Sequence, residues 1–427
     1  MDLQKIAAQS SVIEAEKRRE EAERRAELAA LQPISFEQLE AEVKKWMLVA
    51  DIGIIKLLPA IIIANRLQGH DPVWAFLIGP SGGGKTEFLN SLFDLSDVYP
   101  VSLLTPNTFL SGMAGKNDSS LLPQIDKKIL IFKDWTNILS QNKDARNEIM
   151  GQLREIYDGH MKKPFGTGVV REWKGKIGLI AGVTGAVDMA QQMHSTLGER
   201  FIQYRLSMPD REEVAWRALN NGNNQKEMRI ALRNAYYAFM KGIEMPKEMP
   251  VLPEEVKKEI ISIANFSTMA RSGVIREFSF KKEVIFVPAA EMPTRIVQQL
   301  STVATGYLIL NKGEALKEDM ETIYRIALDC IPQTNYMVLK EMARGNKRTT
   351  AEMASELGYP TSTIRMYLEN LALLGVCTRI KASDTEEGGT ADRWTLLPKF
   401  SEILRHYETI KLIEEQKLEE IDETLNF

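Results

Sequence analysis

The chain has 427 residues, with 54 lysines and arginines, 58 aspartates and glutamates, and a net charge of −4. Its length suggests about two to four folded domains. A hydrophobic content of 44% and a charged content of 26% are typical of a globular protein and exclude a mostly disordered, collagen-like or disulfide-rich chain. The near-neutral charge also excludes a uniformly basic nucleic-acid coat, so any nucleic-acid contact must come from local basic clusters.

The cysteines and the apolar runs indicate where the protein resides. Cys330 and Cys377 have no paired spacing and are expected to be free thiols. The most apolar run, residues 52–63, is shorter than the roughly 20 residues that span a bilayer, and Lys56 and Pro59 interrupt it. The first 31 residues lack the apolar core of a signal peptide. We therefore expect a soluble, cytoplasmic protein with no membrane contact, in which residues 52–63 form a buried helix.

The first third of the chain predicts two helices and a strand after a charged segment. Residues 1–31 mix both charge signs over a thin apolar stripe, so a solvated helix or a weak coiled coil is expected. A capping box at Ser35 and Gln38 begins the next helix, and a second helix ends near Gly69. Residues 73–78 are an unbroken apolar run between chain-breaking residues, which predicts a buried strand of a parallel sheet.

The rest of the chain predicts an α/β core followed by helices and a small mixed domain. Strands are expected at residues 101–104, 128–132 and 177–183, with helical patterns between them, which favours a parallel α/β sheet. A mainly helical region with one hairpin at residues 276–287 follows. From residue 335, helices followed by strand-like runs around a turn-rich segment predict a winged helix-turn-helix. The predicted units are residues 1–31, 32–208, 209–332, 333–400 and 401–427, the last a charged helix.

Residues 79–86 match the phosphate-loop pattern G-x-x-x-x-G-K-[ST] without a gap, between a predicted strand and a predicted helix. The glycines let backbone N–H groups face phosphate oxygens, and the helix N-terminus adds positive potential. Lys85 would reach the β- and γ-phosphates, and the Thr86 hydroxyl would hold Mg²⁺. The alternative is a glycine-rich turn with an incidental lysine. The residues predicted to bind ATP are Gly79, Pro80, Ser81, Gly82, Gly83, Gly84, Lys85 and Thr86.

A phosphate-loop ATPase also needs a carboxylate at the end of a neighbouring strand. The apolar run of residues 128–132 ends at Lys133 and Asp134, so one carboxylate is present where two are usual. Asp134 is predicted to polarise water, to hold Mg²⁺ through water, or to do both. The alternative is a strand-end aspartate that makes a turn. The single carboxylate weakens the case for fast hydrolysis more than the case for nucleotide binding.

Several later segments occur in the order used by AAA+ ATPases, and over about residues 73–310 the chain resembles the branch that contains the minichromosome-maintenance helicases and their relatives on phages and mobile elements. Residues 178–184 resemble the sensor-1 strand, with Thr184 where asparagine is common. Residues 195–201 are similar to the L-x-S-R-F segment, which implies that Arg200 is an arginine finger acting across a subunit boundary. Residues 291–295 resemble the sensor-2 segment, which implies that Arg295 contacts phosphate from a helical lid.

The resemblance implies a homo-oligomer, most simply a ring of six, with catalytic roles for Lys85, Asp134, Thr184, Arg200 and Arg295. The last three also have structural interpretations, as a strand-end threonine, an ion-paired arginine and an ordinary helix-start arginine.

Two basic regions are candidate nucleic-acid contacts. Residues 158–176 carry five basic and two acidic residues, a net charge of +3, where this AAA+ branch inserts a hairpin toward a central channel. In the predicted winged helix, residues 350–359 form the first helix of the motif, and the recognition helix begins at residue 360. Because the wing tip, residues 384–387, is acidic, protein docking is an alternative to DNA contact for the winged helix. For the hairpin, the alternative is a solvated loop without a DNA contact. The predicted contact residues are Lys162, Lys163, Arg171, Lys174, Lys176, Arg348, Ser362, Thr363 and Arg365.

Together these features predict an oligomeric, ATP-hydrolysing AAA+ motor that acts on DNA, with Mg²⁺ as cofactor, in the manner of a replicative helicase. One alternative is an ATP-switched DNA-binding initiator, loader or regulator with slow hydrolysis. The other is a protein-remodelling ATPase of the same branch.

Overall fold

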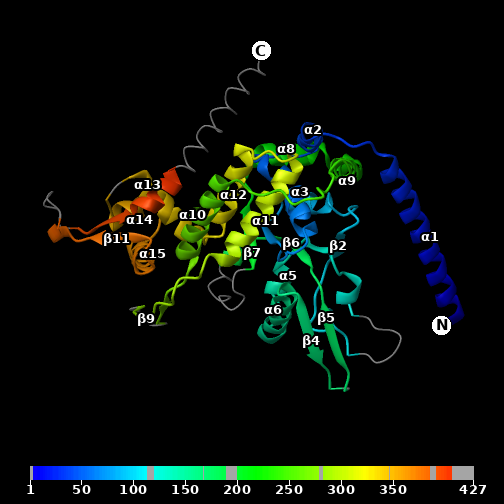
Figure 1. The fold of residues 1–427 in the computed structure, drawn as a ribbon, viewed down its shortest axis with the longest axis horizontal. Helices are drawn as coiled ribbons and strands as arrows, with labels where there is room; N and C mark the ends of the chain where they lie inside the picture. Colours follow the sequence, from blue (N-terminus) through cyan, green and yellow to red (C-terminus); the bar gives the residue numbers. More distant parts are fainter. Residues whose placement is uncertain are drawn as a thin grey trace, which may run out of the picture.

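The computed structural model describes residues 3–112, 120–166, 168–188, 200–277, 282–345, 347–384 and 391–405, with side chains from residue 15 onward. At its centre is a five-stranded, all-parallel sheet in the order β2-β3-β6-β1-β7 (Figure 1). The strands are β1 (Trp74–Ile78), β2 (Val98–Val101), β3 (Ile129–Phe132), β6 (Gly178–Val183) and β7 (Phe201–Arg205). The predicted parallel α/β sheet is therefore confirmed.

Both faces of the sheet are covered, as the continuous apolar runs of β1, β3 and β6 require. Alternate side chains of β1 enter two separate cores: Trp74 and Phe76 face one, and Ala75 and Leu77 face the other. The first core includes α6 (Lys143–Tyr157), and the second includes α3 (Gly53–Arg66) and α4 (Lys85–Asn90). A strand that is buried on both faces is apolar at every position instead of alternating between apolar and polar residues. The continuous apolar runs therefore predicted these strands from the sequence.

Two strand predictions need correction. The strand expected at residues 101–104 lies at residues 98–101, and β7 was not predicted. Pro100 lacks the N–H that a central strand donates, so its presence does not favour a strand at residues 98–101. However, β2 is an edge strand of the sheet, where the missing N–H of a proline is tolerated. Residues 201–205 are short and include Gln203 and Arg205, so no continuous apolar run marks β7.

The N-terminal helices are α1 (Leu3–Ala30), α2 (Phe36–Trp46) and α3. Ser35 and Gln38 form both hydrogen bonds of the predicted capping box at the start of α2. Helix α3 contains most of residues 52–63 and is buried along almost its whole length, as expected. Among the residues described, the structure has no helix whose length and apolar character would let it span a membrane.

A helical region follows the sheet, and a C-terminal unit packs against it. The helical region comprises α8 (Arg211–Asn220), α9 (Gln225–Lys241), α10 (Glu254–Arg271), α11 (Thr294–Leu310) and α12 (Lys317–Asp329), with the predicted hairpin formed by β8 (Ile275–Arg276) and β9 (Val284–Phe286). The C-terminal unit comprises α13 (Gln333–Arg344), α14 (Thr350–Leu357) and α15 (Thr361–Leu373), with the strands β10 (Arg348–Thr349), β11 (Cys377–Ile380) and β12 (Arg393–Leu396). The strands form an antiparallel sheet in the order β10-β12-β11.

The hydrophobic core does not break at the predicted boundary after residue 332. One continuous core runs from the helical region into the C-terminal unit, and the rings of Phe266 and Phe400 lie 4.9 Å apart across the junction. The C-terminal unit is therefore packed on the helical region rather than tethered to it. The predicted helix over residues 401–427 lies beyond the described residues from residue 406 onward, as does most of the acidic wing tip.

Candidate nucleotide-binding site

The predicted phosphate loop is a tight connection between β1 and α4. The N–H of Gly79 donates to the carbonyl of Val183 (3.1 Å), and the N–H of Gly83 donates to the carbonyl of Pro80 (3.2 Å). Gly82 and Gly84 have φ values of +78° and +81°, in the left-handed region that glycine enters without steric cost. The glycines therefore allow the chain to turn sharply at the end of β1 and to begin α4 at once.

The side chain of Lys85 is held inside this loop. It is only 8% exposed, and its Nζ donates to the carbonyl oxygens of Gly79 (2.7 Å) and Pro80 (2.6 Å). Burial lowers the pKa of the ammonium, and the nearby Asp134 carboxylate opposes that shift. The positive charge therefore lies beneath the turn whose backbone N–H groups would face a phosphate.

Two further predicted residues lie at the same edge of the sheet. The N–H of Trp135 donates to the carbonyl of Gly182 (2.8 Å), so the end of β3 adjoins the end of β6, which in turn adjoins β1. Asp134 is the second residue after β3, and Thr184 directly follows β6. The Asp134 carboxylate accepts the N–H of Thr136 (2.9 Å) and remains exposed to solvent. The structure thus brings Lys85, Asp134 and Thr184 to one edge.

The groups at this edge fit a magnesium ion that arrives with a nucleotide. Thr86 and Asp134 are both exposed and both carry oxygen donors. Within the described ranges, no group of three or more histidine, cysteine, aspartate or glutamate residues could hold a metal ion. Mg²⁺ needs no such group, because it is commonly held by one or two protein oxygens together with phosphate oxygens and water. A hydroxyl and one carboxylate are therefore sufficient at this position.

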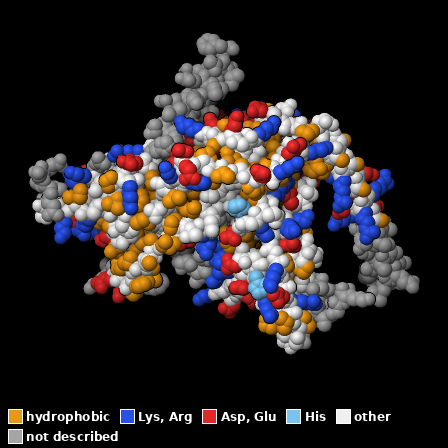
Figure 2. Space-filling view, viewed as in Figure 1, with side chains coloured by type: hydrophobic (Ala, Val, Ile, Leu, Met, Phe, Trp, Pro, Cys, Tyr) orange, Lys and Arg blue, Asp and Glu red, His pale blue; other side chains and the backbone are white. Residues whose placement is uncertain are grey.

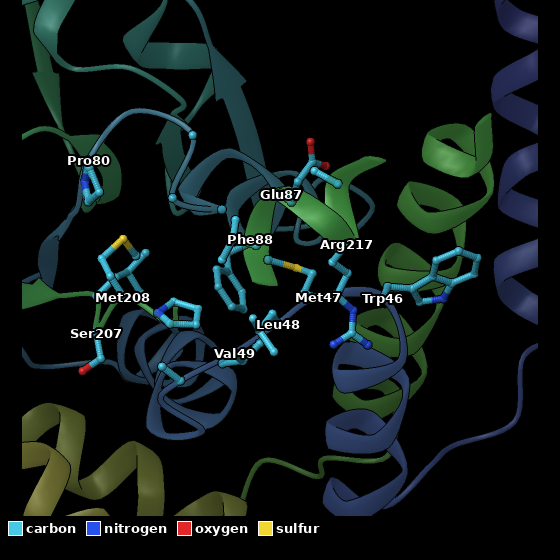
Figure 3. Close-up of a pocket in the computed structure, with 18 of the residues that line it drawn as sticks. Trp46, Met47, Leu48, Val49, Pro80, Glu87, Phe88, Ser207, Met208 and Arg217 are labelled. Atoms are coloured by element: carbon cyan, nitrogen blue, oxygen red, sulfur yellow. The ribbon is translucent and has the colours of Figure 1, made fainter. Parts of the chain in front are cut away.

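A cavity of about 710 Å³ opens beside the loop (Figure 3). Its walls are residues 47–51, residues 206–209, the inner side of α8, Phe88 and Met228. Helix α8 is fixed over it by Arg217, which donates to the carbonyl of Lys45 (2.9 Å). A mostly apolar cavity of this size, with the loop at one end, is typical of a small-molecule site.

Two methionines from opposite cavity walls pack directly on the loop glycines. A Cβ atom on Gly84 would lie 3.1 Å from Cε of Met47, and one on Gly83 would lie 3.1 Å from Cε of Met208. These contacts are tighter than side chains normally accept. A side chain at either position would require the neighbouring methionine to move by a few tenths of an ångström, so the left-handed turn at Gly84 requires glycine more strictly than this packing does.

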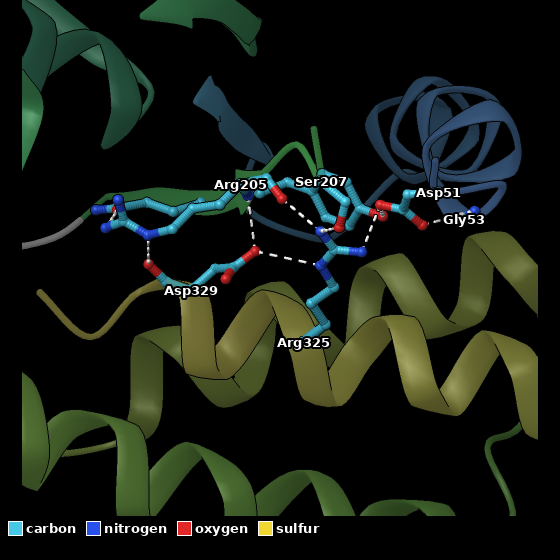
Figure 4. Close-up of polar contacts among 8 residues, drawn as sticks. Asp51, Gly53, Arg205, Ser207, Arg325 and Asp329 are labelled. Carbon is cyan, nitrogen blue, oxygen red and sulfur yellow. Dashed lines mark hydrogen bonds and ion pairs between the residues drawn. The ribbon is translucent and has the colours of Figure 1, made fainter. Parts of the chain in front are cut away.

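Arg325 of α12 joins two walls of the cavity from behind (Figure 4). Its Nη1 donates to the Asp51 carboxylate, and its Nη2 donates to the carbonyl of Arg205 and to the hydroxyl of Ser207 (3.0 Å). Asp51 and Ser207 both line the cavity. The side chain of Arg325 is 17% exposed, so this is a largely buried charge network.

Two more residues complete this network. Asp51 accepts the hydroxyl of Tyr204, and Asp329 accepts the backbone N–H of Arg205 (2.7 Å) and lies 3.6 Å from Nε of Arg325. Burial raises the pKa of Asp329 to about 6, against the opposing effect of Arg325. Sequence reasoning missed the whole network, because Arg325 and Asp51 are 274 positions apart and belong to no short motif.

Arg200 lies at the opposite edge of the sheet from the loop. It directly precedes β7, whose first residue pairs with the first residue of β1. Its side chain is 9% exposed, its Nη2 lies 2.9 Å and 3.1 Å from the Asp158 carboxylate oxygens, and its guanidinium lies 5.4 Å from the centre of the Tyr157 ring. Residues 195–199 of the segment that resembles L-x-S-R-F lie outside the described residues.

Arg295 lies near Arg200 and lines no part of the described cavity. It begins α11 and forms an ion pair with Glu291 (3.6 Å). Gln299, one turn further along the same helix, donates to the backbone carbonyl of Arg200. The structure therefore places the two predicted arginines together at one edge and does not bring either to the loop of its own chain.

The predicted basic hairpin is formed by β4 (His160–Pro164) and β5 (Val170–Lys174). Lys162 and Lys174 are exposed, together with Glu172. Lys163 instead donates to Glu148 (3.1 Å), and Lys176 donates to the carbonyl of Leu67 (2.7 Å). Burial lowers the pKa of Lys176 to about 8. The outward charge of the hairpin is therefore smaller than the sequence indicated, and Arg171 is half-buried.

The C-terminal candidates are divided in the same way. Ser362 and Arg365 are exposed on the first turns of α15, and Thr363 is half-buried beside them. Arg348 is engaged with the buried Glu341 (2.6 Å). On the face shown in Figure 2, basic and acidic side chains are interspersed, so no single basic surface marks a nucleic-acid site there.

Comparison with protein-family models gives no match to this chain, and comparison with curated proteins gives none either. The functional argument therefore depends on the geometry of the loop, the cavity and the charged groups around them.

Proposed function

We propose that the chain is an oligomeric, ATP-hydrolysing AAA+ motor that acts on DNA, with a winged helix-turn-helix as its C-terminal unit. The observation that carries the proposal is the strand–loop–helix at residues 74–90. Its left-handed glycines and its inward-held Lys85 have the features that a phosphate-binding loop requires. The exposed carboxylate of Asp134, which follows β3, two positions from β1 in the sheet, supports the same function.

The adjoining cavity would hold the base and ribose of the nucleotide. It opens at the loop, so a triphosphate on the glycines would direct its base between the walls that carry Met47 and Phe88. Residues 48–50 line this space and lie outside any helix or strand. Their backbone N–H groups would donate to the ring nitrogens of adenine while the apolar walls cover its ring faces.

The chain's own groups have distinct roles in hydrolysis. Lys85 and the N-terminus of α4 place positive charge near the phosphates, and Asp134 orients or polarises the attacking water. Bound Mg²⁺, held by Thr86 and through water by Asp134, would neutralise charge on the phosphate oxygens. Arg200 of a neighbouring copy would complete the site, because its own chain places it at the far edge of the sheet.

DNA contact would use exposed cationic and hydroxyl side chains. Lys162 and Lys174 on the hairpin would follow a phosphate backbone in a central channel, and Ser362 and Arg365 on α15 would contact duplex DNA. The antiparallel sheet behind helices α13–α15 supports a winged-helix assignment for this unit.

An ATP-driven switch remains the second candidate, because one observation favours it. Asp134 is the one carboxylate at this strand end, and it already accepts the N–H of Thr136. A poorly placed base would leave nucleotide binding intact while hydrolysis is slow. Such a protein would bind DNA and assemble with ATP as an initiator or regulator, without moving along the strand.

Strand separation on a forked DNA substrate, measured alongside ATP hydrolysis, tests the proposal. A motor should separate the strands only with ATP, and single-stranded DNA should stimulate its hydrolysis. Changing both Lys162 and Lys174 to alanine should weaken both effects, whereas the same loss of charge at the exposed Lys247 and Lys258 should not. ATP-dependent assembly and DNA binding without strand separation would support the switch. Hydrolysis that DNA does not affect would contradict the motor, and the absence of any DNA binding would contradict both.

A further inference from the structure

The base of the basic hairpin contains a residue that contacts Arg200. Helix α6 ends at Tyr157, Asp158 follows it, and Gly159 turns the chain with a φ of +79° into β4. The N–H of Gly175 donates to the carbonyl of Gly159 (3.1 Å) and closes the hairpin at this point. Asp158 therefore lies at the junction between a packed helix and the exposed hairpin, so a displacement of the hairpin would move its carboxylate.

The ion pair between Asp158 and Arg200 links this junction to the start of β7. The Arg200 side chain is only 9% exposed, whereas that of Asp158 is 56% exposed. The guanidinium is held between the Asp158 carboxylate and the Tyr157 ring. In this position it is directed into its own chain, so it must move before it can reach a phosphate in a neighbouring copy.

An ion pair that is open to solvent on one side is easily exchanged. Such pairs shift a two-state equilibrium by a factor of about five at most. The contact can therefore hold Arg200 back in the absence of DNA and still release it when a competing anion is offered or when Asp158 moves.

We infer that Asp158 is a positioning residue that restrains Arg200 and couples it to the hairpin. DNA bound on the hairpin would displace Asp158 and free the guanidinium for the nucleotide of a neighbouring copy. The inference rests on the proposed function, because it requires Arg200 to act between subunits. It adds a specific consequence, namely that removal of an acidic side chain should raise activity.

Steady-state ATP hydrolysis by the full-length protein, with and without single-stranded DNA, tests this inference through Asp158→Asn. The variant keeps the shape of the side chain and removes its charge. The rate without DNA should rise about two- to five-fold, the stimulation by DNA should shrink correspondingly, and KM for ATP should not change. Asp158→Glu keeps the negative charge, so its hydrolysis should depend on DNA as that of the wild type does. Glu155→Gln, an exposed change on α6 three residues earlier, should behave as the wild type.

The gain must also depend on Arg200, so it should disappear in the double variant Asp158→Asn, Arg200→Ala. A gain that persists there overturns the inference. The inference is also overturned if DNA stimulates the wild type but the rates of Asp158→Asn are unchanged, or are lower both with and without DNA. In that case the proposed function stands. A wild-type protein that hydrolyses no ATP refutes the proposed function and this inference together.

Discussion

Replacement of Arg325 by methionine is expected to destabilise the protein through the charge network behind the cavity. The change leaves the carboxylates of Asp51 and Asp329 without their cationic partner, and their side chains are only 13% and 12% exposed. It also removes the donor to the carbonyl of Arg205 and to the hydroxyl of Ser207. Loss of one partner from a buried charge network costs about 3–5 kcal/mol. We therefore expect the free energy of unfolding to fall by about that amount.

Equilibrium urea unfolding, followed by tryptophan fluorescence, measures this loss. Lys317→Met is the matched control, because Lys317 is 68% exposed and lies 4.0 Å from Glu321, so its loss should cost less than about 1 kcal/mol. Arg325→Lys keeps the charge but cannot reach all the acceptors at once, and it should give an intermediate value. Because Asp51 and Ser207 line the cavity, ATP affinity should also fall in folded Arg325→Lys. An Arg325→Met protein within about 1 kcal/mol of the wild type would refute the reasoning.

Two further predictions concern single side chains. Lys85→Met should weaken ATP binding at least about ten-fold in calorimetric titration, because one charge-assisted hydrogen bond contributes about 1.5–3 kcal/mol. Lys247→Met, the control, should leave ATP affinity unchanged. Equal ATP affinities of Lys85→Met and the wild type would contradict the loop assignment. The folded pKa of Asp329, raised to about 6, means that ionisation of this group opposes folding at neutral pH and that the penalty fades as the pH falls through 6. The stability of the wild type relative to Asp329→Asn should therefore rise by about 1.4 kcal/mol between about pH 7.5 and about pH 5, and a difference independent of pH would contradict the assigned shift.

The parts of the fold that were predictable depend on local pattern. The strand β1 and its loop were found because an apolar run, three consecutive glycines and a lysine occur together without a gap. The buried α3 was found because its run was too short and too interrupted for a bilayer. In contrast, β2 was misplaced because the cost of Pro100 depends on whether the strand is at an edge, and a sequence does not show its neighbours.

The candidate site was predictable only where a short motif or the end of a strand marked it. Asp134 and Thr184 were located from strand ends, because the carboxyl ends of parallel strands meet at one edge. The partners of Lys163 and Lys176 come from α6 and from the segment after α3, so the net charge of the hairpin overstated the charge that it presents. The network around Arg325 joins segments more than 100 positions apart, and no spacing rule indicated it.

The central claim is that a nucleoside triphosphate binds in the glycine loop at a boundary between copies of the chain. The most direct measurement is the mass of the native particle, with its bound nucleotide, in the presence and absence of ATP and Mg²⁺. The account predicts a nucleotide-bound assembly of several copies that Lys85→Met fails to form. A particle that remains a single chain and carries no nucleotide at millimolar ATP would contradict it.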